Sequence, residues 1–190
     1  MTKLSLAGIT VAILATDGVE QVALTTPRAA LEAAGARTLL VSPKAGRITS
    51  WNGDRRGAEF AVDLSLADAR AEDFDALLVP GGTAGAAALN ADPAAIAFVR
   101  ALDAQDKPIA AICHGPWLLA TADIARGRRV AAWPTLAKEL RDAGAVWVDS
   151  QVVVDGRIVT CRSPRDLASF MRPAIAQFAA QFSGGTLQTH

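Results

Sequence analysis

The sequence predicts a doubly wound α/β fold, in which a mostly parallel sheet is sandwiched between helices. Several short segments are apolar throughout, as expected of strands that are buried on both faces. Segments with helical periodicity separate most of these strands, which suits the crossover connections of parallel pairs. The 190 residues suffice for one large core, so we expect a single domain over residues 1–182 and a flexible tail over 183–190.

The first half of the chain alternates strands and helices, and turn residues mark the boundaries. Gly35 ends the first helix, Asn52-Gly53 suits a hairpin turn, and Asp92-Pro93 should break the last helix. The expected order is strand 9–15, helix 22–35, strand 37–42, hairpin or irregular excursion 47–63, strand 75–82 running into a glycine turn, and helix 84–102.

The second half continues the alternation and closes on a long helix. Asp155-Gly156 lies between two β-branched runs and is a strong hairpin signal. The expected order is strand 108–112, helix 116–125, short strand 129–133, short helix 136–144, strand 146–148, hairpin 151–161 and helix 164–182.

Composition excludes several classes of partner. Lysine and arginine (19) balance aspartate and glutamate (19), so no overall field attracts nucleic acid or an anionic membrane. Tyrosine is absent and aromatic residues make up 5% of the chain, which argues against a base-stacking surface. We therefore expect small molecules or further copies of this chain as partners, and no membrane contact.

The cysteine and histidine counts bear on metals and on the cellular compartment. Two cysteines and two histidines make a poor zinc set, so we expect no metal and no cofactor. Isolated cysteines are typical of reduced thiols in the cytosol. Lys3 and the apolar run after it vaguely resemble a signal peptide, but the β-branched residues favour a buried strand. We expect a cytoplasmic protein.

Three loops with chemically suggestive residues should meet at one edge of the sheet. The first strand leads to the loop 17–20, the third to Pro80-Gly81-Gly82, and the strand 108–112 to Cys113-His114. In doubly wound folds ligands bind beyond the carboxyl ends of the strands. The convergence of these loops predicts a site that includes Glu20, Gly82 and Cys113.

The stretch AICHGPW indicates a nucleophile elbow, a tight strand-to-helix turn that raises a nucleophile above the sheet. Ala111 and Gly115 leave room for the bend, and Pro116 suits the first turn of a helix. The positive end of that helix should favour the thiolate of Cys113. The alternative is a buried, inert cysteine, a common fate for this residue type.

The stretch AICHGPWLL resembles the nucleophile region of the PfpI family of intracellular proteases and stress proteins, within the class I glutamine amidotransferase-like superfamily. ATDGVEQVALTTPRAALEAAGA, DALLVPGG and AGAVWVDSQVVVDGRIVTCRSPRDLASFMR also resemble their counterparts, in order. The resemblance covers almost the whole chain. It implies a flavodoxin-like, glutamine amidotransferase-like version of the predicted fold.

By this resemblance Cys113 is the nucleophile, His114 is its neighbour, and Glu20 approaches the sulfur from the first loop. A carboxylate beside a thiolate is repelled, so one of the two should hold a proton. The backbone N–H groups of Gly82 and His114 are candidates for an oxyanion hole. Trp117 is expected to wall the pocket, with core packing as the alternative.

The other tryptophans and the second cysteine are expected to have structural roles. Trp51, Trp133 and Trp147 have no claim beyond packing or an interface, and Cys161 follows the second hairpin turn within a strand.

Two departures from relatives limit the function. In hexameric peptidases of the family, an acid from a neighbouring subunit completes a triad with the histidine, but residues 86–88 are alanines here. Without an orienting acid the imidazole direction is loosely fixed. The glutamine amidotransferase reaction is excluded, because it needs a second, distant histidine and the other histidine is His190, the last residue.

Three functions remain, ranked here in order. The first is a deglycase-like or glyoxalase-like hydrolase that acts on methylglyoxal or on its early adducts with proteins, through Cys113. The second is a redox-responsive stress protein or chaperone whose Cys113 is oxidised. The third is an intracellular cysteine peptidase. Family members form dimers and larger rings, so we expect a homo-oligomer.

Overall fold

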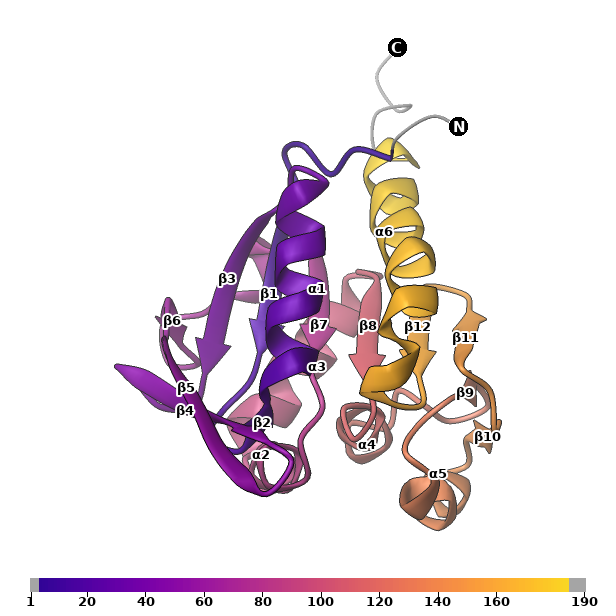
Figure 1. Cartoon of the computed structure of the whole chain (residues 1–190). Coiled ribbons are helices and arrows are strands. Elements are labelled where there is room, and N and C mark those ends of the chain that lie inside the picture. The colour runs from indigo at the N-terminus through magenta and orange to yellow at the C-terminus, as the bar shows by residue number, and fades with distance from the viewer. Residues whose placement is uncertain (1–3, 185–190) are drawn as a thin grey trace.

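The main sheet of the computed structural model, which describes residues 4–184, has seven strands in the order β11-β12-β8-β7-β1-β3-β6 (Figure 1). Neighbouring strands run parallel except β11 and β12, which form the hairpin expected at Asp155-Gly156. This is the predicted doubly wound topology. The strands are β1 (Thr10–Leu14), β3 (Arg37–Ser42), β6 (Leu64–Ser65), β7 (Ala76–Val79), β8 (Ile109–Ile112), β11 (Val152–Asp155) and β12 (Ile158–Cys161).

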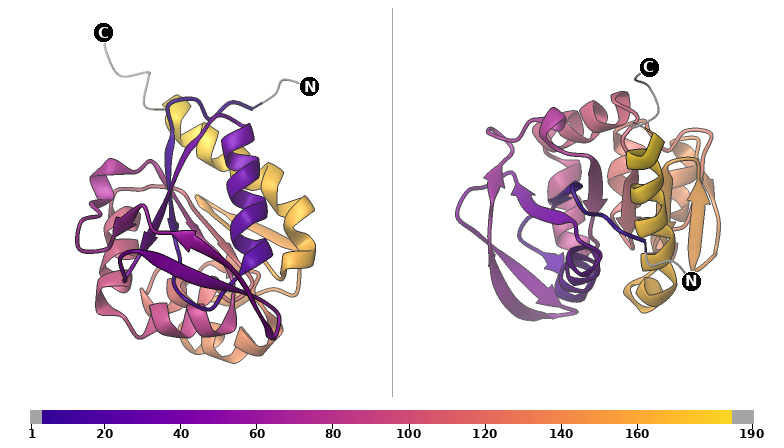
Figure 2. Two further views of the ribbon diagram at one scale, coloured as in Figure 1. Left: turned by 60° about the vertical axis from the view of Figure 1, so that its left-hand side comes forward. Right: turned by 90° about the horizontal axis from the view of Figure 1, so that it is seen from above.

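Helices cover both faces of this sheet (Figure 2). One layer holds α1 (Gln21–Ala33) and α6 (Leu167–Gly184). The other layer holds α2 (Thr83–Asn90), α3 (Pro93–Ala104), α4 (Pro116–Thr121) and α5 (Ala137–Asp142). Short 3-10 helices lie at Ala71–Asp73, Pro134–Leu136 and Pro164–Asp166.

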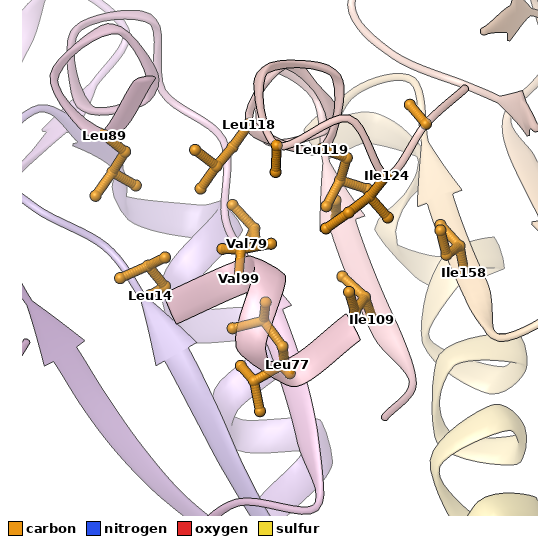
Figure 3. Close-up of a cluster of buried hydrophobic side chains, with 14 of the residues drawn as sticks. Leu14, Leu77, Val79, Leu89, Val99, Ile109, Leu118, Leu119, Ile124 and Ile158 are labelled. Atoms are coloured by element: carbon orange, nitrogen blue, oxygen red, sulfur yellow. The ribbon is translucent and has the colours of Figure 1, made fainter. Parts of the chain in front are cut away.

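The uniformly apolar strands are explained by the two cores that they separate. On β8, Ile109 and Ala111 face the core under α3 and α4, whereas Ala110 and Ile112 face the core under α1 and α6. Figure 3 shows the first of these cores, with Ile109 among the labelled side chains. Burial of one such aliphatic side chain stabilises the fold by roughly 1.5–3 kcal/mol, so neither face tolerates polar residues.

Two small sheets lie outside the main one. The expected hairpin forms between β4 (Arg47–Asn52) and β5 (Arg55–Ala61), with Gly53 at φ +64° in its turn. Strand β2 (Val19–Glu20) pairs with β4, so the hairpin is attached to the loop that carries Glu20. The second small sheet pairs β9 (Arg129–Val130) with β10 (Val146–Trp147).

Several boundaries differ from the sequence predictions. The helix expected at 84–102 is broken as predicted, and the side chain of Asp92 caps α3 by accepting from the N–H of Ala94. The strand expected at 129–133 stops at Val130, because the N–H of Ala131 donates to Thr160 Oγ1 and that of Trp133 to the carbonyl of Cys113.

The last helix also differs in its limits. A 3-10 turn precedes α6, which runs from Leu167 to Gly184 and so includes the first two residues of the predicted tail. The rest of that tail, 185–190, lies outside the described residues.

Candidate active site

The turn between β8 and α4 is a sharp elbow with Cys113 at its tip. Cys113 has φ +59°, in the left-handed region that residues with a side chain rarely adopt. The N–H of Gly115 donates to the carbonyl of Ile112 at 2.7 Å and closes the turn. A Cβ at position 115 would lie 2.4 Å from the carbonyl oxygen of Val79, so only glycine fits there. The chain holds Cys113 in a strained conformation, as is common at functional sites.

The sulfur of Cys113 is surrounded by hydrogen-bonding groups. Its Sγ lies 3.2 Å from Nδ1 of His114, and the backbone N–H groups of His114 and Gly82 donate to it. Only 5% of the residue is exposed. Burial raises the pKa of the thiol to about 12; the two N–H groups oppose this rise, and the charge of Glu20 adds to it. The thiol of the unliganded protein is therefore protonated at neutral pH.

The expectation of a stabilised thiolate is wrong for this resting state. Helix α4, which follows the elbow, contains six residues, Pro116–Thr121, so few peptide dipoles add up at its N-terminus. The loss of water around the buried sulfur outweighs that field and the two N–H donors. Cys113 must lose its proton during the reaction rather than before it.

Glu20 reaches the site from β2 in the first loop. Its N–H donates to the carbonyl of Gly81 at 3.0 Å, which ties this loop to the glycine turn after β7. Its Oε2 accepts from the N–H of Gly53 at 3.2 Å, at the tip of the β4–β5 hairpin. The carboxylate therefore lies between the sulfur and the hairpin.

Gly82 packs its backbone against the first loop. It has φ +116°, and a Cβ there would lie 2.4 Å from the carbonyl oxygen of Gly18 and 2.5 Å from the nitrogen of Glu20. A Cβ on Gly81 would lie 2.8 Å from the Cβ of Cys113. Both glycines are needed for the three loops to approach one another this closely.

His114 is held between the sulfur and an indole. Its ring stacks on that of Trp133, with centroids 5.8 Å apart and planes inclined by 25°. The N–H of Trp133 donates to the carbonyl of Cys113 at 2.8 Å, so the stacking residue is anchored to the elbow itself. Burial lowers the pKa of His114, which leaves the imidazole neutral near pH 7.

These groups line one open cavity of about 570 Å³. The hairpin contributes Trp51, Gly53 and Asp54, and the loop after β9 contributes Trp133. The lining residues are Gly18, Glu20, Trp51, Gly53, Asp54, Gly82, Thr83, Ala84, Cys113, His114, Trp133 and Pro164. A reactive thiol, an imidazole and a carboxylate thus share a space large enough for a small ligand.

A family model described as "DJ-1/PfpI family" matches residues 9–177. The chain belongs to the DJ-1/PfpI family. A Bacillus subtilis relative named "Putative cysteine protease YraA" is 36% identical over 87% of this chain and 95% of its own. A Pyrococcus abyssi relative named as a deglycase is 38% identical over 85% of this chain and 95% of its own.

A solved structure shows the same fold. The chain superposes with a TM-score of 0.83 and 30% identity on an Anabaena variabilis protein that contains DJ-1/ThiJ/PfpI-like and ferritin-like domains. The match covers 89% of this chain and 48% of that two-domain chain.

In this DJ-1/PfpI protein the cavity brings together Glu20, Gly82, Cys113 and His114, all of which the sequence proposed as site residues. The placement of Trp117 is corrected. Its indole is half-buried and packs against the core under α3 and α4 rather than lining the cavity. It is the second residue of α4, and that helix turns this position towards the core.

The cavity contains residues that the sequence reasoning missed. Trp51 and Trp133, which were expected only to pack or to form an interface, line it, as does Asp54. The Asn52-Gly53 signal located the hairpin turn, but no local signal showed that this turn folds over the first loop. Trp133 answers the question of what orients His114 when residues 86–88 provide no carboxylate, because its ring stacks on the imidazole.

Two searches of the described residues gave no candidates. Between residues 4 and 184, no helix is long and apolar enough to cross a membrane. Over the same range, no three His, Cys, Asp or Glu side chains are grouped so that they could hold a metal ion.

Proposed function

We propose that this protein is a cysteine-dependent hydrolase of small carbonyl compounds, with methylglyoxal or its early adducts as substrates. The 3.2 Å contact between Cys113 Sγ and His114 Nδ1, at the wall of an open cavity, is the observation that carries the proposal. The deglycase name of relatives 35–38% identical to this chain supports it.

The first step is attack of the sulfur on the aldehyde carbon. Because burial keeps His114 neutral, its Nδ1 can take the thiol proton as the carbon–sulfur bond forms. The N–H groups of Gly82 and His114 converge on the sulfur, so they lie close to the oxygen that becomes negative during attack. The imidazolium then returns the proton to that oxygen, which yields a hemithioacetal.

The remaining steps balance without an external oxidant or reductant. Glu20 takes the proton from the former aldehyde carbon, and a proton is returned to the neighbouring carbon. The first carbon is thereby oxidised to a thioester and the second is reduced to an alcohol. Water then cleaves the carbon–sulfur bond, lactate leaves, and the sulfur regains its proton. With an adduct, the carbon–nitrogen bond breaks during the initial attack and the free amine takes the proton.

The same geometry argues against efficient peptide hydrolysis. A scissile amide demands a firmly oriented general acid for its amine leaving group. Among the described residues, burial is the cause that moves the pKa of His114, and stacking on Trp133 rather than a carboxylate orients its ring. An aldehyde is a more reactive electrophile and makes no such demand.

Lactate production from methylglyoxal tests the proposal. Wild type and Cys161→Ala should form lactate, whereas Cys113→Ser should lose at least about 100-fold in kcat/KM. Adducts also dissociate spontaneously, so lactate rather than loss of adduct is measured by NMR, with protein-free samples as background. Equal rates for wild type and Cys113→Ser would refute the proposal.

A fluorogenic peptide, supplied to the same three proteins, distinguishes the alternatives. Cys113-dependent peptide cleavage without lactate would show a peptidase. Oxidation of Cys113 by peroxide with neither activity would indicate a redox-responsive protein.

A further inference from the structure

The cavity has a marked charge asymmetry at its rim. Glu20 and Asp54 are its acidic lining residues, and no lysine or arginine is among the described residues that line it. Asp54 is exposed at the tip of the β4–β5 hairpin and forms no ion pair with any described residue. Its neighbour Arg55 is exposed too but does not line the cavity. The space above Cys113 is therefore electronegative.

Two indoles line the same space. Trp51 and Trp133 are 39% and 38% exposed, which is unusual for such large apolar side chains. They come from opposite sides of the elbow: Trp51 lies on the hairpin attached to the first loop, and Trp133 follows β9, which contacts β12. Exposed indole faces next to unpaired carboxylates form a binding environment typical of cationic groups.

We infer that the site selects substrates carrying a positive charge, and in particular the guanidinium of an arginine side chain modified by a small dicarbonyl. This inference rests on the proposed function and specifies its substrate class. The guanidinium is planar and keeps its charge at neutral pH, so it can stack on an indole while its N–H groups donate to a carboxylate. Asp54 and Trp51 are the specificity-determining residues, and Cys113 with His114 performs the chemistry.

Asp54 is assigned to recognition rather than to reaction. Glu20, which accepts from the N–H of Gly53, raises the pKa of the Cys113 thiol, whereas Asp54 has no such effect on the sulfur. Loss of Asp54 should therefore weaken binding of cations and leave the chemical step intact. Its signature is a change in KM for cationic substrates with little change in kcat.

Binding of two isosteres tests the inference without requiring turnover. Nα-acetylarginine amide carries a guanidinium, and Nα-acetylcitrulline amide replaces it with a neutral urea of the same shape. By calorimetry, wild type should bind the arginine compound on the order of tenfold more tightly than the citrulline compound. In Asp54→Asn and in Trp51→Leu the preference should fall below about threefold.

Asp73→Asn is the matched control, because Asp73 is exposed and precedes β7, at the opposite end of the sheet from the cavity. This variant should keep the wild-type preference. Equal affinities in wild type, an unchanged preference in Asp54→Asn, or no measurable binding of the arginine compound would overturn the inference.

The lactate assay with free methylglyoxal, run on the same preparations, keeps the two proposals separate. Cys113-dependent lactate formation without any preference for the cation would leave the hydrolase standing and refute only the charge selection.

Discussion

The ends of β8 and β12 place two buried cysteines side by side in very different surroundings. The N–H of Cys113 donates to the carbonyl of Cys161 at 3.0 Å, and burial raises the pKa of both thiols. At Cys161, however, the strand continues without an elbow, the side chain is 0% exposed, and the Sγ donates to the carbonyl of Ser163. Thiol burial and pKa thus do not identify a nucleophile; the backbone turn, the adjacent imidazole and the cavity do.

Alkylation should separate the two thiols by the largest factor. With iodoacetamide, Cys113 should react on the order of 100-fold faster than Cys161, because Cys113 borders the cavity whereas Cys161 needs local unfolding. The pKa of about 12 predicts that labelling of Cys113 rises steadily up to pH 10 with no plateau. Mass spectrometry of tryptic peptides reports both sites in one sample. A plateau below pH 8.5 would contradict the assigned pKa.

The stacked indole provides the next largest effect. Trp133→Ala should reduce kcat by roughly tenfold, because His114 loses the ring that fixes its orientation. Trp133→Phe retains a stacking face and should keep most of the activity. Labelling of Cys161 is the internal control for folding in both variants. Equal losses in both variants would show that stacking is not the relevant contact.

Glu20 should affect thiol reactivity and turnover in opposite directions. In Glu20→Gln the like charge near the sulfur is removed, so the pKa of Cys113 falls and alkylation at pH 8 should accelerate by about fivefold. Lactate formation should nevertheless decrease, because the proposed base is lost. Labelling of Cys161 should not change. A variant that is slower in both assays would contradict the electrostatic effect assigned to Glu20.

The sheet and its site edge could be predicted because their causes are local. Apolar runs such as 108–112 define strands, Gly115 and Pro116 define the elbow, and Asp155-Gly156 defines a hairpin. The parallel order then requires the loops after β1, β7 and β8 to end at one edge. Family resemblance was still needed to assign Glu20 to the sulfur, since an exposed first-turn acid was the ordinary alternative.

The remaining features depend on contacts between distant segments. Trp51 and Trp133 enter the cavity through the pairing of β2 with β4 and through the hydrogen bond from Trp133 to Cys113, and neither leaves a periodic signal. Trp117 was assigned by proximity to Cys113, but the direction in which a helix turns a side chain decides its contacts. The raised pKa of Cys113 likewise follows from packing, which motif matching does not measure.

The β4–β5 hairpin lies outside the seven-stranded sheet, yet its tip forms part of the cavity wall. Replacement of residues 52–54 would alter the shape and charge of that wall without breaking any hydrogen bond of the main sheet. Surface loops of this kind tolerate insertions and exchange. Substrate range can therefore diverge among descendants of this chain while the reaction centre is inherited unchanged, and libraries for directed evolution should start at this tip.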